Sequence, residues 1–171
     1  MSDLKPLNEI TEPDKRNIYF VITNSMGKAR KLTLNEIYEE VDRIQLHNKV
    51  PEHIKDHFLQ AKHLAIYSWF YNPFMGTALL LGLIALDYAL ISKKGKKAPL
   101  KNMIREAVEK GWIKDEGFSI AKIRDKKKVP YVETLITVIP ALRNKLAHGS
   151  NMDTSSISSL LTCAEFINQL F

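Results

Sequence analysis

The longest apolar run in the sequence is Phe74-Met75-Gly76-Thr77-Ala78-Leu79-Leu80-Leu81-Gly82-Leu83-Ile84-Ala85-Leu86, and the carboxylate Asp87 follows it directly. Asn72-Pro73 breaks the preceding pattern, so one helix is predicted from residue 73 to about Ile91. Because its apolar residues occupy nearly every side, we expect this helix at the centre of the fold, with neighbours on most faces. The run is too short for a membrane span and favours a buried core helix.

Other segments with helical spacing surround this central one. They predict helices from Glu52 to about Phe70, from Leu100 to near Gly111, from near Pro130 to Gly149 with a kink at Pro140, and from about Thr154 to Leu170. Residues 112–129 are predicted to form a long polar connection, anchored by Trp112, Phe118, Ile120 and Ile123. The fold class is therefore an all-α bundle over residues 50–171.

Residues 1–49 are predicted to form a small extension of that bundle. Its first 17 residues are polar and contain two prolines, which indicates a loose lead-in. Residues 18–22 favour a strand or a hairpin, with a turn signal after them. Thr33 with Glu36 is typical of a capping box that begins a helix through about Leu46.

Cysteine content and the N-terminus limit the class of protein. Cys163 is the single cysteine, so the chain forms no internal disulfide and no cysteine-based zinc site. In its apolar helical pattern it is interpreted as a buried small hydrophobe. The first residues lack the basic and apolar regions of a signal peptide, so we expect a cytoplasmic protein without a membrane partner.

The net charge of +6 is unevenly distributed. Residues 91–148 hold 15 Lys and Arg against 6 Asp and Glu. The basic residues form two clusters, Lys93, Lys94, Lys96 and Lys97, and then Arg124, Lys126, Lys127 and Lys128. One interpretation is two solvated loops. The other is a contact surface for a polyanion such as RNA, because lysine clusters release counterions when they meet phosphates.

A second functional signal is Arg143-Asn144-Lys145-Leu146-Ala147-His148-Gly149. A guanidinium offers a planar fork of donors to phosphate, and an imidazole exchanges a proton near neutral pH. RNA cleavage without a metal needs both groups, although their spacing alone also arises by chance. The structural alternatives are an ion pair of Arg143 with Asp87 or another carboxylate and, for His148, a favourable interaction with a helix C-terminus.

Together these segments resemble the higher eukaryotes and prokaryotes nucleotide-binding (HEPN) superfamily, in its Arg-x4-His type. The similarity spans residues 50–171 and includes the 143–148 motif, the central helix ending in Ala85-Leu86-Asp87, and the lead segment that starts at Val50-Pro51. The resemblance implies a bundle of four or five helices. It also implies a metal-independent endoribonuclease of a bacterial toxin or antiphage defence system, with a possible antitoxin or defence-system partner and no cofactor.

The resemblance assigns roles to the motif residues. His148 is expected to act as general base or acid, Arg143 to hold the scissile phosphate, and Asn144 to orient them, giving 2′,3′-cyclic phosphate and 5′-OH ends. Asp87 is expected to orient Arg143, and Lys145 joins the RNA-binding lysines. The alternative is a catalytically inactive HEPN module that binds RNA, nucleotide or a protein.

Helix geometry adds a condition to that assignment. Arg143 and His148 are separated by roughly 140° and about 7.5 Å of rise in a regular helix, so both cannot reach one atom. Either the helix unwinds towards Gly149 or a second subunit completes the site. HEPN proteins usually dimerise, so we expect a homodimer. No metal site is expected, because His53 and His57 lack a third ligand, and both are interpreted as part of a solvated helix face.

Overall fold

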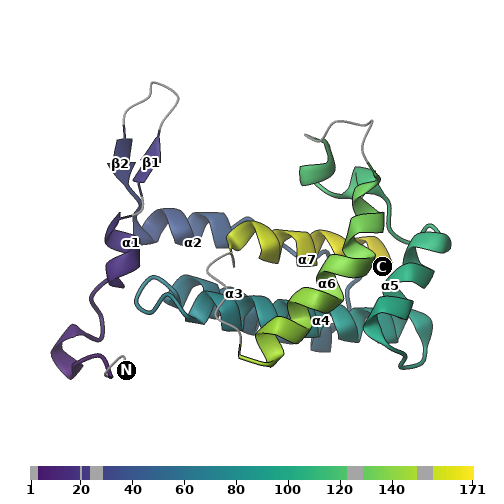
Figure 1. Ribbon diagram of the computed structural model, residues 1–171, viewed down its shortest axis with the longest axis horizontal. Coiled ribbons are helices and arrows are strands. Elements are labelled where there is room, and N and C mark those ends of the chain that lie inside the picture. Colours follow the sequence, from purple (N-terminus) through teal and green to yellow (C-terminus); the bar gives the residue numbers. More distant parts are fainter. Residues whose placement is uncertain (1–3, 20, 24–28, 123–128, 150–155) are drawn as a thin grey trace.

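The computed structural model describes residues 4–19, 21–23, 29–122, 129–149 and 156–171, and within these it is mostly helical (Figure 1). The α-helices are α1 (Lys15–Tyr19), α2 (Leu34–Asp42), α3 (Glu52–Tyr67), α4 (Phe74–Lys94), α5 (Leu100–Glu109), α6 (Tyr131–Ala147) and α7 (Ile157–Leu170). Shorter elements are the strands β1 (Val21–Thr23) and β2 (Ala29–Lys31) and the 3-10 turns η1 (Leu7–Glu9), η2 (Asp115–Gly117) and η3 (Ile120–Lys122). The predicted all-α bundle is confirmed.

Helix α4 is the central helix, as its composition predicts. It packs against α3, α5, α6 and α7, and α6 crosses it obliquely (Figure 1). Its buried residues are Ala78, Leu79, Gly82, Leu83, Ala85, Leu86, Ala89 and Leu90. By length and composition α4 could cross a membrane, with 21 residues and a mean hydropathy of 2.0 over its most apolar window. The packing of its inner face against other helices instead makes it the core of the bundle.

The closest approach within the core lies between α4 and α7 at Gly82. A Cβ at this position would lie 2.7 Å from Leu160 Cδ1 and 3.7 Å from Cys163 Sγ. Leu160 and Cys163 are themselves buried, so neither side chain moves away freely. The absence of a side chain at Gly82 therefore sets the distance between the two helices.

We expect Gly82→Ala to destabilise the fold and Gly76→Ala, in the same helix, to stabilise it. At Gly76 a Cβ would meet only Leu146 Cδ2, at an ordinary 3.7 Å, so alanine adds helix propensity of up to about 1 kcal/mol. At Gly82 the same gain is outweighed by an overpacking cost of about 1–3 kcal/mol. Urea unfolding of the two variants measures both effects. Equal stabilisation by both alanines would contradict the predicted close packing.

The N-terminal extension differs in part from its prediction. A hairpin is present, with Val21 opposite Lys31 and Thr23 opposite Ala29. Residues 18 and 19 were expected in the strand, but they belong to α1. Tertiary bonds explain this difference, because the buried Asn17 side chain donates to the carbonyls of Ser68 and Trp69. The polar lead-in, described from residue 4 on, is also more ordered at its end than predicted, since Asp14 N–H donates to Trp69 O at 2.8 Å.

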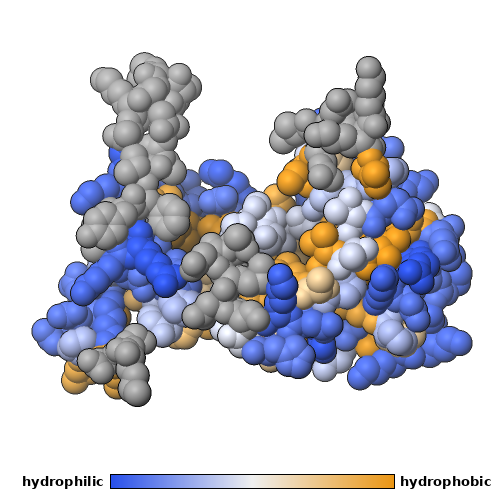
Figure 2. Space-filling view, in the orientation of Figure 1, coloured by the Kyte–Doolittle hydropathy of each residue, from blue (hydrophilic) through white to orange (hydrophobic). Residues whose placement is uncertain are grey.

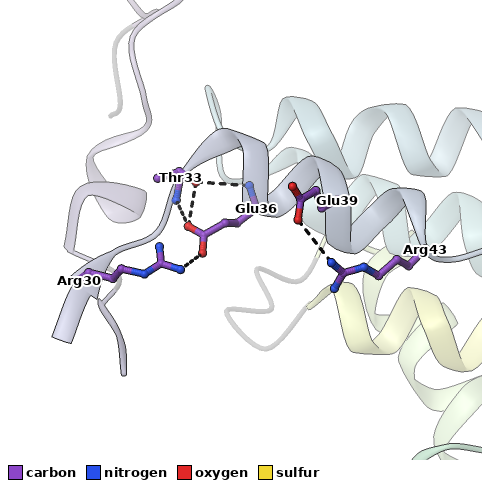
Figure 3. A network of polar contacts seen from close by, with 5 residues as sticks. All are labelled: Arg30, Thr33, Glu36, Glu39 and Arg43. Carbon is purple, nitrogen blue, oxygen red and sulfur yellow. Dashed lines mark hydrogen bonds and ion pairs between the residues drawn. The ribbon is translucent and has the colours of Figure 1, made fainter. Parts of the chain in front are cut away.

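Helix α2 begins with the predicted capping box (Figure 3). Glu36 N–H donates to Thr33 Oγ1 at 3.3 Å, and Thr33 N–H donates to Glu36 Oε2 at 3.0 Å. Arg30 from β2 pairs with the same carboxylate and, as the largest cause, lowers the pKa of Glu36 to about 2. Helix α2 thus connects the hairpin, through the Arg30–Glu36 ion pair, to the bundle, into which Ile37 and Val41 of α2 are buried.

The end of α2 was predicted wrongly. The helix stops at Asp42 instead of Leu46, because the following segment bonds to α7. Asn168 Nδ2 donates to Gln45 O, and His47 N–H donates to Asn168 Oδ1. Ile37 and Val41 of α2 lie in the same buried cluster as the α3 and α4 side chains, so the core crosses the boundary predicted at residue 49.

Other boundaries shift by a few residues. Helix α3 ends at Tyr67, and α4 continues to Lys94, where Gly95 (φ 77°) forms a left-handed C-cap. Helix α6 continues through Pro140. Helix α7 begins at Ile157, directly after its N-cap Ser156. Residues 154 and 155, which were predicted to start this helix, lie outside the described residues.

The connection after α5 is anchored in part as predicted, since Trp112 packs against the core. Phe118 is fully buried and packs edge-to-face with Phe166, and Ile113 is buried as well. Ile120 was expected as an anchor but is 47% exposed, since the turn η3 directs it outward. Ile123 lies outside the described residues.

Candidate functional site

The predicted Arg–His motif occupies the last turns of α6. Arg143 is half-buried on the side of α6 that faces the bundle, whereas Asn144, Lys145 and His148 are exposed. The helix stays regular through the motif, with His148 N–H donating to Asn144 O at 3.0 Å. The chain turns left-handed only at Gly149 (φ 75°), after the histidine. Unwinding therefore does not bring Arg143 and His148 together within one protomer.

The motif lies beside the first turns of α4. Leu146 packs near Gly76, as the 3.7 Å distance from a Cβ placed there shows. Helix packing thus places the C-terminal end of α6 against α4. The adjacent side of α4 also holds Asp87, about three turns further along.

Asp87 lies in the electrostatic field of Arg143 and Lys97 without a direct ion pair. Burial raises the pKa of Asp87, and the charges of Arg143 and Lys97 offset only part of this effect. Among the described residues no cation lies within 4.0 Å of the Asp87 carboxylate. The structural alternative of a contact ion pair between Arg143 and Asp87 is therefore wrong, and Arg143 keeps its donors for another anion.

We expect Asp87→Asn to stabilise the protein at neutral pH. A carboxylate whose pKa is raised by folding favours the folded state below its unfolded pKa of 3.8, and this contribution is lost as the pH rises through the folded pKa. The neutral amide avoids that loss. Thermal unfolding from pH 3 to pH 8 should show the variant more stable at the upper end, with the difference shrinking on acidification. A variant less stable at neutral pH would indicate that the carboxylate supports the fold.

The predicted RNA-binding lysines divide into three groups. Lys93 and Lys94 were placed in a turn, but they form the last turn of α4, where cations interact favourably with the helix dipole. Lys96 and Lys97 are exposed in the turn that follows. Arg124, Lys126, Lys127 and Lys128 lie outside the described residues.

The sequence interpretation missed that α5 and the residues after it supply Glu106, Lys110 and Trp112 to the basic end of α4. Lys93 Nζ lies 5.7 Å and Lys110 Nζ 4.9 Å from the centroid of the Trp112 ring. Glu106 pairs with Lys110 at 2.7 Å and also accepts from Lys94, and these contacts, that of Lys110 the larger, lower the pKa of Glu106 to about 2. A signal was present, since Glu106 and Lys110 are spaced for an ion pair on one helix.

The outer face of α4 is apolar and half-exposed. We define it by Thr77, Leu80, Ile84 and Tyr88, which follow helical spacing opposite the buried side. Leu80 and Ile84 are only partly covered and do not pack against the buried core. Tyr88 is 43% exposed, and its ring stacks on that of His57 of α3 at 4.9 Å. The sequence interpretation had assigned His57 to a solvated face.

A second surface with exposed apolar side chains lies over α6. Figure 2 shows apolar side chains gathered over α6 and towards α5, interrupted by hydrophilic ones. Val129 and Val138 are exposed by 69% and 48%. The hydrophilic side chains distinguish this surface of α6 from the outer face of α4, where Leu80 and Ile84 lie one helical turn apart.

In the part of the chain that the structure describes, metal, thiol and cavity chemistry offer no competing site. Within the described ranges, no group of three or more His, Cys, Asp or Glu is arranged to hold a metal ion. Cys163 is buried, as predicted, and burial raises the pKa of its thiol to about 12. A cavity of about 170 Å³ between α3 and residues 44–46 combines apolar walls with Lys55, Asp56 and Lys62. None of its lining residues belongs to the motif.

No family model, curated protein or solved structure matches the chain. The resemblance to the HEPN superfamily therefore rests on the residues of this sequence. The functional argument is made from the motif, its neighbours and the outer face of α4.

Proposed function

We propose that this protein is a homodimeric, metal-independent endoribonuclease of the HEPN type, acting in a bacterial toxin or antiphage defence system. The observation that supports this most is the placement of Arg143 and His148. Both lie at the accessible end of α6, in a helix that is regular between them. Arg143 has no contact carboxylate among the described residues, and His148 is exposed. Each is available to a substrate.

The proposed reaction is an internal transesterification. The His148 imidazole removes the proton of a ribose 2′-OH, and the 2′ oxygen attacks the adjacent phosphorus. The bond from phosphorus to the 5′ oxygen breaks, and an imidazolium protonates the leaving oxygen. Arg143 stabilises the charge that develops on the phosphate, and Asn144 orients the reacting groups. The products are a 2′,3′-cyclic phosphate and a 5′-OH end.

Dimerisation is part of this proposal. Arg143 and His148 diverge by roughly 140° on α6, so we assign each active site to Arg143 of one protomer and His148 of the other. The outer face of α4 is the proposed contact surface. It is apolar, half-exposed and adjacent to the side of α4 against which the end of α6 packs. Two copies meeting there cover Leu80 and Ile84 and bring two α6 ends towards a shared cleft.

The direct test uses purified full-length protein with single-stranded and hairpin RNA in excess EDTA. We expect cleavage that persists in EDTA and products with cyclic phosphate ends, identified by mass spectrometry. Light scattering at micromolar concentration should report a dimer. Cleavage that EDTA abolishes, or 3′-OH products, would contradict the mechanism.

The second candidate is an inactive HEPN module that binds RNA. The separation of Arg143 and His148 within one protomer favours it if the protein remains monomeric. This candidate predicts that RNA binds with strong salt dependence and stays intact. Asp87→Asn also discriminates, because the nuclease proposal predicts slower cleavage by this variant and the inactive module predicts no cleavage by either protein.

A further inference from the structure

The basic end of α4 and α5 forms a fixed cluster of cations, which we define as Lys93, Lys94 and Lys110 around Trp112 and Glu106. Two ammonium groups lie over the indole, at 5.7 Å for Lys93 and 4.9 Å for Lys110. Glu106 pairs with Lys94 and Lys110, and Lys93 has no ion-pair partner among the described residues. Two of the three ammonium groups thus share one carboxylate, and three positive charges against one negative charge leave the cluster a net charge of about +2.

The cluster is ordered before any ligand arrives. Cation–π contacts hold Lys93 and Lys110, and the ion pair holds Lys94, which is half-buried. Free surface lysines lose side-chain entropy when they bind, whereas these have lost much of it in folding. Because the ammonium groups already occupy the indole face, the cluster suits phosphate oxygens rather than a stacked base.

The cluster also lies at a defined distance from the motif. Leu146 of the motif packs beside Gly76 of α4, and Lys93 lies 17 positions after Gly76 in the same helix. A regular helix rises about 1.5 Å per residue, so roughly 25 Å separates the two levels. The charges of Lys97, just after α4, and of Arg143, near the end of α6, both act on Asp87.

We infer that Lys93, Lys94 and Lys110 form a phosphate-binding anchor for the RNA backbone, separate from the cleavage site and roughly 25 Å along α4 from the end of α6. This inference rests on the proposed function and specifies its substrate. At about 3.4 Å per nucleotide along a stacked strand, an RNA must extend roughly seven nucleotides from the scissile phosphate to reach the anchor. Contacts are to phosphates, so the anchor selects RNA length and not sequence.

The test measures RNA binding in a His148→Ala background, which removes cleavage without touching the cluster. Fluorescence anisotropy is recorded at several salt concentrations for Lys93→Gln with Lys110→Gln. The matched control is Lys15→Gln with Lys49→Gln, which removes the same charge from exposed lysines outside the cluster. RNAs of about 20 and about 5 nucleotides are compared, because only the longer one spans the distance.

We expect the cluster variant to bind the long RNA roughly tenfold more weakly at moderate salt, and its slope of log affinity against log salt to fall by about 1.4 relative to the control, as for two lost phosphate contacts. The short RNA should bind both variants alike. In a Trp69→Phe background, Trp112 is the single tryptophan, and its emission should change with the long RNA only. Lys110→Arg, which keeps the charge, should retain binding.

Several outcomes would overturn the anchor. Equal salt slopes for the cluster and control variants would do so, as would equal effects on long and short RNA, or an absence of RNA binding. Failure of the anchor and failure of the nuclease proposal can be told apart. If long RNA binds through the cluster but is never cleaved by the wild-type protein, the anchor stands and the nuclease proposal fails. If cleavage depends on His148 and is independent of RNA length, the nuclease proposal stands and the anchor fails.

Discussion

Arg143→Ala and His148→Ala should each reduce RNA cleavage by at least about 100-fold while leaving the fold intact. General acid–base groups contribute about 10²–10⁴ in rate, and a donor that stabilises developing charge contributes about 10²–10³. Both side chains lie outside the buried core, so their loss removes little packing. Initial rates on a labelled RNA in EDTA, with circular dichroism of each variant, measure the effect. Unchanged cleavage in both folded variants would eliminate the proposed site.

A mixture of the two variants tests whether the site is shared. If Arg143 of one protomer acts with His148 of the other, a mixed dimer contains one intact site and one doubly altered site. After subunit exchange, an equal mixture should regain about a quarter of the wild-type rate. A mixture as inactive as its components would show that each site needs both residues from the same chain, contrary to the regular geometry of α6.

Ile84→Asp should convert the dimer into a folded monomer and remove most of the cleavage activity. Ile84 lies on the outer face of α4, is half-exposed and does not pack against the buried core. A monomer tolerates a carboxylate there, whereas a dimer would bury it without a partner at a cost of about 3 kcal/mol or more. The dimer dissociation constant should therefore rise by at least about 100-fold. The dimer fraction measured by sedimentation and the rate of RNA cleavage should decline together.

The matched control for Ile84→Asp is Leu59→Asp. Leu59 is an apolar residue of α3 that is 51% exposed and lies outside the outer face of α4. It should leave the oligomeric state and the cleavage rate unchanged. If both aspartates act alike, the effect is one of general destabilisation. If Ile84→Asp remains dimeric and active, another surface makes the dimer.

Local chemistry made several elements predictable. Thr33 and Glu36 satisfy the first amide groups of α2, and Gly149 adopts the left-handed conformation at the end of α6. The end of α2 was missed, because Asn168, more than 100 positions away, competes for the backbone of Gln45. The start of the hairpin was missed for a similar reason, since Asn17 bonds to the carbonyls after α3.

The candidate site likewise combines features that local sequence predicts with features that depend on tertiary contacts. The 143–148 motif and the lysines after the central helix could be identified from spacing and charge. The cluster around Trp112 could not, because it joins residues of two helices that meet only after folding. The absence of a contact ion pair between Asp87 and Arg143 is likewise a property of how α4 and α6 pack.

The amino-acid sequence by itself determined that this protein is a helical bundle around an apolar central helix, because periodicity and burial preference act within each segment. It also placed a guanidinium and an imidazole five positions apart at the end of one helix. Only the tertiary structure decided that this helix stays regular up to Gly149 and that, among the described residues, Leu80 and Ile84 on the outer face of α4 do not pack against the buried core. These features depend on which helix faces meet, and that is set by contacts between residues far apart in the chain.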